Sequence, residues 1–166
     1  MPQAMSQREQ YDLEWNGWKA AAGAFEGVRR YGQISRRVAA LAPERMLDVG
    51  CGDGRLAREI KQVVPGVVVH GCDLSVAALD RAEGLDRKYA VDLNVERLPE
   101  PDGSLDLVVA SEVMEHLVEP GRTVAEFHRV LRPRGHVVVT VPNVAFWRFR
   151  VEALRGDVPS VTADER

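Results

Sequence analysis

Short apolar runs and amphipathic segments follow one another along most of the chain. Aliphatic runs of strand length stand at residues 45–49, 67–72, 88–91, 105–110 and 136–141, the third being the weakest. Apolar residues at helical spacing predict helices at residues 55–64, 75–82 and 121–131, with two further helices between residues 8 and 41. Strands that alternate with helices in this way predict an α/β fold with a mainly parallel sheet.

Proline and glycine mark where the predicted helices end. Gly23 and Gly27 break the first helical segment in two, and Pro43 ends its second half. Pro133 and Gly135 end the helix at 121–131 and begin the last strand. We therefore expect a Rossmann-like, doubly wound sheet of about five strands with helices on both faces. A single domain would comprise N-terminal helices at 1–42, a core at 43–143, and a C-terminal helix and tail at 144–166.

Composition narrows the class of protein. Hydrophobic residues make up 45% of the chain and charged residues 28%, which is an ordinary globular balance. The 22 basic and 25 acidic side chains give a net charge of −3, which disfavours nucleic acid and anionic membranes as partners. Two cysteines are too few for a disulfide framework or a zinc cluster. With no signal sequence and no long apolar run, a cytoplasmic protein is expected.

A glycine cluster directly follows the first predicted strand. Gly50, Gly52 and Gly54 stand at every second position, where they let the backbone turn sharply and approach a ligand. Asp48 lies at the end of the strand, where a carboxylate can offset the positive charge of an amino or sulfonium group. Arg55 occupies the place where a dinucleotide-binding fingerprint prefers another glycine, which disfavours a nicotinamide-dependent oxidoreductase.

This D-x-G-x-G-x-G pattern resembles the first motif of class I S-adenosylmethionine-dependent methyltransferases. The segment 107–117 resembles their fourth motif, particularly in quinone-biosynthesis and other small-molecule O-methyltransferases, and the likeness extends over residues 46–143. The resemblance implies S-adenosylmethionine as the cofactor. It also implies a set of cofactor-binding residues: Asp48, Gly50, Cys51, Gly52, Gly54, Asp73, Leu74, Asp92, Leu93 and Ser111.

Two further acids follow the second and third strands. Asp73 can accept hydrogen bonds from both hydroxyls of a ribose, although it could instead cap the next helix, for which Ser75 is a rival. By the family resemblance, Asp92 would accept from the adenine amino group while the N–H of Leu93 meets the ring. Three acids in this order support the cofactor assignment more strongly than any one of them does alone.

The catalytic candidates follow the fourth strand. Glu112, Glu115 and His116 would lie beside the methyl group, and a histidine suits a general base near neutral pH. Their spacing is similar to the metal site of small-RNA 3′-terminal ribose methyltransferases. Those enzymes need a later histidine, and none follows His136, so we expect no metal. Alternatively, Glu115 and His116 form a structural pair at the start of a helix.

The C-terminal segment leaves other functions open. Its P-N-x-x-x-W-R-x-R pattern, from Pro142, resembles MetW-like proteins, which support a homoserine acyltransferase. Arg148, Arg150 and Arg155 lie beside aromatic residues, as on an RNA-binding surface, but their spacing also suits an ordinary amphipathic helix. A MetW-like partner protein and a nucleic-acid methyltransferase are thus the alternatives to our leading hypothesis, a methyltransferase with a small-molecule acceptor and a preference for oxygen.

The resembling family normally adds a two-stranded hairpin after the fifth strand. No such hairpin follows up to Arg166, so we expect either a fragment of a longer protein or a minimal form in which the fifth strand has an exposed edge. Because an exposed edge offers unpaired backbone groups to another chain, we expect that a homodimer could form there.

Overall fold

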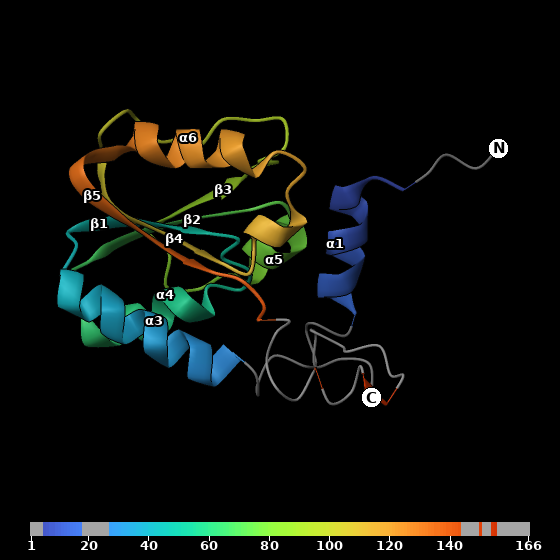
Figure 1. Ribbon diagram of the computed structural model, residues 1–166, viewed down its shortest axis with the longest axis horizontal. Coiled ribbons are helices and arrows are strands. Elements are labelled where there is room, and N and C mark those ends of the chain that lie inside the picture. Colours follow the sequence, from blue (N-terminus) through green and yellow to red (C-terminus); the bar gives the residue numbers. More distant parts are fainter. Residues whose placement is uncertain (1–4, 18–26, 144–149, 151–153, 156–166) are drawn as a thin grey trace.

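Five parallel strands form the centre of the protein, and helices cover both of their faces (Figure 1). The computed structural model describes residues 5–17, 27–143, 150 and 154–155. The strands are β1 (Arg45–Val49), β2 (Val68–Asp73), β3 (Arg87–Ala90), β4 (Leu105–Ser111) and β5 (Leu131–Thr140). The helices are α1 (Gln7–Asn16), α3 (Gly27–Leu41), α4 (Arg55–Val63), α5 (Val76–Arg81) and α6 (Pro120–Val130), with a 3-10 turn, η1, at Met114–His116.

The strands lie in the order β3-β2-β1-β4-β5, and every adjacent pair is parallel. The chain winds outward in one direction from β1 to β3 and then crosses over to β4, so the order reverses between β1 and β4. In open sheets of this kind a ligand binds beyond the carboxyl ends of the strands at the point of reversal. The predicted fold class and five-stranded parallel sheet are confirmed.

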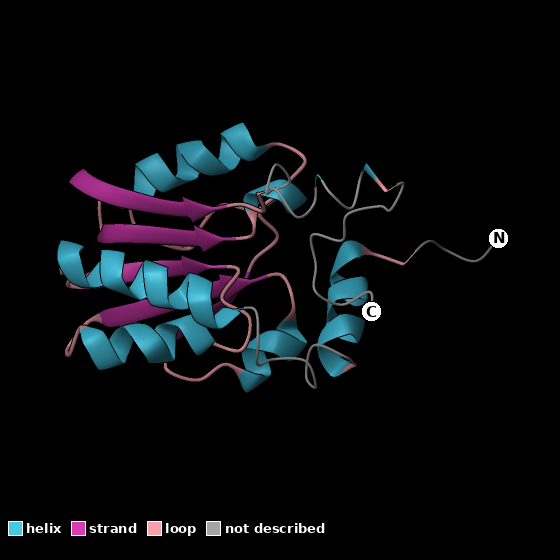
Figure 2. Cartoon of the chain, turned by 60° about the horizontal axis from the view of Figure 1, so that its bottom comes forward, coloured by secondary structure: helices cyan, strands magenta, loops and turns pink. Residues whose placement is uncertain are grey.

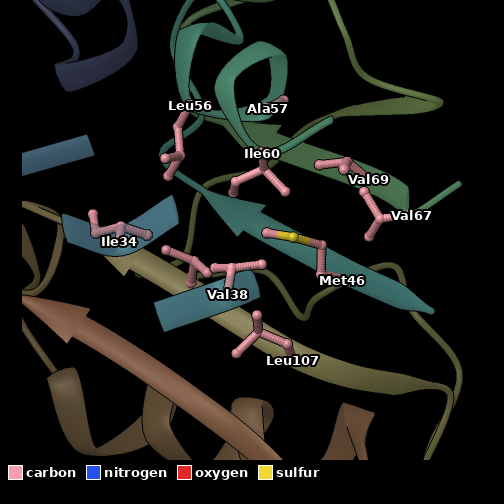
Figure 3. Close-up of a cluster of buried hydrophobic side chains, with 10 residues drawn as sticks. Ile34, Val38, Met46, Leu56, Ala57, Ile60, Val67, Val69 and Leu107 are labelled. Carbon is pink, nitrogen blue, oxygen red and sulfur yellow. The ribbon is translucent and has the colours of Figure 1, made fainter. Parts of the chain in front are cut away.

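Two apolar clusters lie on opposite faces of the sheet, because successive side chains of a strand point to opposite sides. Met46 of β1 and Val69 of β2 join one cluster together with α3 and α4 (Figure 3). Leu47 and Val49 of β1 join the other cluster, which includes Phe127 of α6. Burial on both faces explains why the strands are nearly continuous apolar runs in the sequence.

The last strand begins earlier than the sequence indicates. We predicted a start at residue 136, after Pro133 and Gly135, but β5 begins at Leu131, directly after α6. An irregularity separates the pairs Leu105↔Leu131 and Leu107↔His136, and Arg134 has a positive φ of 67°. Proline is tolerated in an edge strand at such a bulge, where its missing N–H is not needed for pairing. The other predicted elements between residues 45 and 130 agree to within one residue at each end.

Part of the β5 surface is exposed in the described part of the chain. The strand pairs with β4 on one side, and Val137 and Val139 are 44% and 46% exposed. Self-association through this edge stays a prediction. The C-terminal pattern that favoured the alternative functions lies almost wholly outside the described residues. No helix in the described ranges is both long and apolar enough to cross a membrane.

A buried polar pair ties β2 to the loop before β4. The Nδ1 atom of His70 lies 2.6 Å from Oε1 of Glu100, and both residues are at least nine-tenths buried. The ring of Tyr89 on β3 packs edge-on against the imidazole. Since both side chains are almost wholly removed from water, each depends largely on the other for its hydrogen bond.

We therefore expect Glu100→Ala to lower the free energy of unfolding by about 1–3 kcal/mol, because it leaves the imidazole buried without its partner. Glu83→Ala is the matched control: Glu83 pairs with Arg58 at 3.8 Å, but its side chain is 76% exposed, so its loss should cost less than about 1 kcal/mol. Denaturant unfolding of both variants measures the difference. Equal losses would contradict a stabilising role for the buried pair.

Candidate functional site

A cavity of about 180 Å³ lies at the carboxyl ends of the strands, where the strand order reverses. In Figure 2 the strands point toward α1, which lies beyond their ends. Predicted residues from four successive loops line the cavity: Gly50 and Gly52 after β1, Asp73 and Leu74 after β2, Asp92 and Leu93 after β3, and Glu112 and His116 after β4.

The glycine turn is held in a left-handed backbone conformation. Gly50 and Gly52 have φ values of 68° and 53°, and both border the cavity. The N–H groups of Gly50 and Cys51 donate to the carbonyl of Cys72 on β2, at 2.8 and 3.1 Å. Gly54 has a different role: it lies outside the cavity lining, and a Cβ there would collide with the backbone carbonyl of Glu83.

Asp73 does not cap α5, whose N-cap is Ser75, and its carboxylate instead holds the backbone on either side of it. Its Oδ2 accepts from the N–H of Gly52 at 2.9 Å, and its Oδ1 accepts from the N–H of Ser75 at 2.9 Å. Ser75, in turn, caps α5 by accepting from the N–H of Ala78. Each carboxylate oxygen can accept a second hydrogen bond, so Asp73 can also face a ligand in the cavity that it lines.

The loop after β3 is fixed by its own side chains. Asp92 accepts from the N–H of Asn94 at 2.9 Å through Oδ1, and its own N–H donates to Glu96. The Asn94 side chain accepts from the N–H of Val118 and donates to Gln7 of α1. Asn94 thus links three segments around the cavity, a role that the sequence pattern did not indicate.

Asp48 is buried away from the cavity lining. It is only 2% exposed, and its Oδ2 has no hydrogen-bond partner among the described residues. Burial, together with the nearby charge of Asp73, raises the pKa of Asp48 to about 8. Two other predicted cofactor residues also lie outside the lining: Cys51, whose thiol has a pKa raised by burial, and Ser111, whose hydroxyl is 3.0 Å from that of Thr140.

The catalytic candidates differ in their surroundings. Glu112 has a strained φ of 58°, accepts from the Thr140 hydroxyl at 3.1 Å, and lies 3.7 Å from the guanidinium of Arg30. His116 is exposed at the cavity and meets the ring of Tyr11 edge-on, with 6.2 Å between ring centroids. Glu115 is exposed and outside the lining.

Glu115 and His116 lie in the short 3-10 turn η1 and not at the start of α6, which begins at Pro120, so a structural role for the pair stays an alternative. In the described ranges, no group of three or more His, Cys, Asp or Glu side chains is placed to hold a metal ion.

Helix α1 completes the cavity, and the sequence pattern alone gave it no such role. Gln7, Tyr11 and Trp15 line the cavity from one face of the helix. Two signals were available: the four-residue spacing of these side chains, and the capping box between Ser6 and Glu9 that starts the helix.

Comparison with known proteins places the chain among methyltransferases. Residues 47–139 match the methyltransferase domain family. The chain is 39% identical over 115 residues to a ubiquinone biosynthesis O-methyltransferase of Nitrosococcus oceani, covering 65% of this chain and 48% of that protein. It is 34% identical over 104 residues to a malonyl-[acyl-carrier protein] O-methyltransferase of Legionella pneumophila, covering 60% of this chain and 37% of that protein. The chain thus spans about half the length, or less, of these relatives.

A solved structure supports the same placement. The S-adenosylmethionine-dependent methyltransferase of Mesorhizobium loti is 28% identical, with a TM-score of 0.55, over 65% of this chain and 53% of that one. The family match covers more than half of the chain and includes the glycine turn and the loop after β4. The chain therefore belongs to the class I S-adenosylmethionine-dependent methyltransferases.

Proposed function

We propose that this chain binds S-adenosylmethionine in the cavity beneath α1 and transfers the methyl group to a small-molecule acceptor, with an oxygen acceptor favoured. The observation that carries the proposal is one cavity that joins Gly52, Asp73, Asp92 and His116 across four neighbouring strands. The O-methyltransferase names of the two relatives support the preference for oxygen.

The strand order sets the direction in which an elongated ligand would lie. Asp92, Asp73 and Gly52 follow β3, β2 and β1, which are neighbours in the sheet. Asp92 and the N–H of Leu93 would hold the adenine, Asp73 the ribose, and the glycine turn the amino-acid end. Asp48, buried behind the turn, would offset the positive charge at that end. The reacting end would then lie near β4, the next strand in the same order.

The loop after β4 would supply the acceptor side. When bound, the cofactor supplies a sulfonium methyl group, which passes in line to a nucleophilic atom of the acceptor as its bond to sulfur breaks and the neutral thioether is left as the product. Glu112 is engaged with Arg30 and Thr140, so it holds the shape of this loop. His116 is exposed beside the cavity and can accept the proton of a hydroxyl acceptor. Positioning of the acceptor and exclusion of water would provide the rest of the catalysis.

Binding tests the cofactor assignment directly. Calorimetry should detect binding of S-adenosylmethionine and of its demethylated product, and no binding of NAD. Asp73→Asn should weaken both by about 10- to 100-fold, since an amide cannot accept all the hydrogen bonds of the carboxylate. Asp102→Asn, at a side chain 80% exposed and remote from the cavity, should change neither. Binding of NAD alone would refute the proposal.

The buried carboxyl of Asp48 predicts a pH-dependent stability. The pKa of this carboxyl is about 8 in the folded protein, against an ordinary value of 3.8. Between pH 4 and 8, Asp48 is therefore ionised in the unfolded chain but protonated in the folded one, so folding must take up a proton, which becomes harder as the pH rises. The wild type should therefore lose stability relative to Asp48→Asn as the pH rises through this window. At pH 7 the substitution should stabilise the unliganded protein by about 1–4 kcal/mol.

The same substitution should weaken binding of the cationic cofactor, because the neutral amide cannot offset its charge. Thermal unfolding from pH 4 to 8 measures the first effect, and calorimetry in two buffers of different ionisation enthalpy detects the proton that the wild type releases on binding. A stability difference that is constant with pH would show that Asp48 is not protonated in the fold.

The exposed imidazole of His116 predicts a separation between binding and turnover. His116→Gln should lower methyl transfer to a hydroxyl acceptor by about a hundredfold or more, while affinity for the demethylated cofactor stays within about twofold. Transfer of labelled methyl to a panel of phenols and carboxylic acids measures turnover. His128→Gln, on the exposed side of α6, is the control. Unchanged turnover would exclude His116 as the base.

A further inference from the structure

Helix α1 is docked against the carboxyl ends of the strands with no fully buried residue, although Tyr11, Asp12 and Trp15 are half-buried. Leu13, for example, is 60% exposed. Apolar burial is the usual source of helix docking, so polar contacts and the residues facing the cavity must supply most of the attachment here. An attachment of this kind can be weakened by one substitution without disturbing the core of the domain.

The strongest of these polar contacts is made by Asp12. Its Oδ1 accepts from the hydroxyl of Ser75 at 2.5 Å and from the N–H of Ala77 at 3.1 Å, at the start of α5. Ser75 is fully buried, and its hydrogen bond to Asp12 is the main cause of the lowered pKa of that carboxyl. Other contacts of α1 join more exposed groups: Gln7 with Asn94 at 3.3 Å, Arg8 with Glu96 at 3.7 Å, and Asn16 with Arg81 at 3.0 Å.

Two aromatic rings reach the cavity on either side of this anchor. The indole of Trp15 lies against the glycine turn, so close that a Cβ at Gly52 would stand 2.7 Å from Cζ2 of the ring. The ring of Tyr11 lies edge-on to His116, with an interplanar angle of 87°. Burial is the largest cause of the raised pKa of Tyr11, so its hydroxyl remains protonated at neutral pH.

We propose that Asp12 is a positioning residue that holds Tyr11 and Trp15 across the cavity, where the two rings form an aromatic wall for the positively charged end of the ligand. The inference rests on the proposed cofactor site. Aromatic faces attract cations, and the two rings line the cavity with Trp15 against the glycine turn and Tyr11 against His116, the two sides between which the sulfonium would be held. The wall therefore favours the charged methyl donor over the neutral thioether product, which helps to exchange product for fresh cofactor.

Calorimetry on the full chain tests this inference with two ligands. Asp12→Ala should weaken binding of S-adenosylmethionine by about tenfold and binding of S-adenosylhomocysteine by about threefold or less. Asp12→Asn retains an acceptor oxygen for Ser75 and should restore most of the affinity. Asp80→Ala, at an exposed position on α5, is the matched control and should bind both ligands as the wild type does.

A double-variant background separates positioning from general destabilisation. In a Tyr11→Leu/Trp15→Leu chain, Asp12→Ala should have no further effect on either affinity, because Asp12 acts through the two rings. Asp12→Ala also leaves the buried Ser75 hydroxyl without its acceptor, so the melting temperature of the unliganded protein should fall. The comparison of the two ligands separates this loss of stability from a change in the cavity, because general destabilisation affects both affinities equally.

Three results would overturn the inference. They are an unchanged affinity in Asp12→Ala, an equal loss for both ligands, and a loss that persists when both rings are absent. Failure of the wild type to bind S-adenosylmethionine would instead refute the proposed function, on which the inference rests.

Discussion

A continuous chain of hydrogen bonds runs from the glycine turn to the N-terminal helix, and the Asp73 carboxylate is its centre. Gly52 and Ser75 donate backbone N–H groups to Asp73, and the Ser75 hydroxyl donates to Asp12 of α1. This chain connects the end of β1, the end of β2, α5 and α1. The N–H groups of Gly50 and Cys51 donate to the carbonyl of Cys72, whereas the N–H of Gly52 depends on Asp73 for its hydrogen bond. Asp73 therefore fixes the shape of the turn and its position relative to the helix that closes the cavity.

Asp48, unlike Asp73, lowers the stability of the fold while suiting the proposed binding site. A buried carboxyl without a partner destabilises the fold, as its raised pKa indicates. A destabilising group of this kind persists where it serves a function, and a cationic ligand next to it would relieve the cost by favouring ionisation. Stability and binding thus oppose each other at this one residue. Asp73 has no such conflict, because the hydrogen bonds that hold the turn also orient its carboxylate toward the cavity.

The sheet and its helices were predictable because burial on both faces makes the strands apolar and leaves turn residues between them. The start of β5 was not predictable, because a proline such as Pro133 usually interrupts a strand. It is accommodated here by a bulge in a strand at the edge of the described sheet. The lining residues next to strand ends, such as Asp73 and Asp92, followed from the rule that sites gather at carboxyl ends. The contribution of α1 depends on contacts between Asp12 and Ser75, 63 residues apart in the sequence, and no local pattern encodes such a pairing.

The two halves of the cavity are built from different kinds of group. On the side of the proposed cofactor site, the backbone of the glycine turn and carboxylates at strand ends line the cavity, and both are fixed by the sheet itself. On the other side stand His116 in an exposed 3-10 turn and the rings of α1, which rest on side-chain contacts. Side chains on exposed segments can change without loss of the fold, whereas the turn cannot. We therefore expect the acceptor specificity of the proposed transferase to reside in the loop after β4.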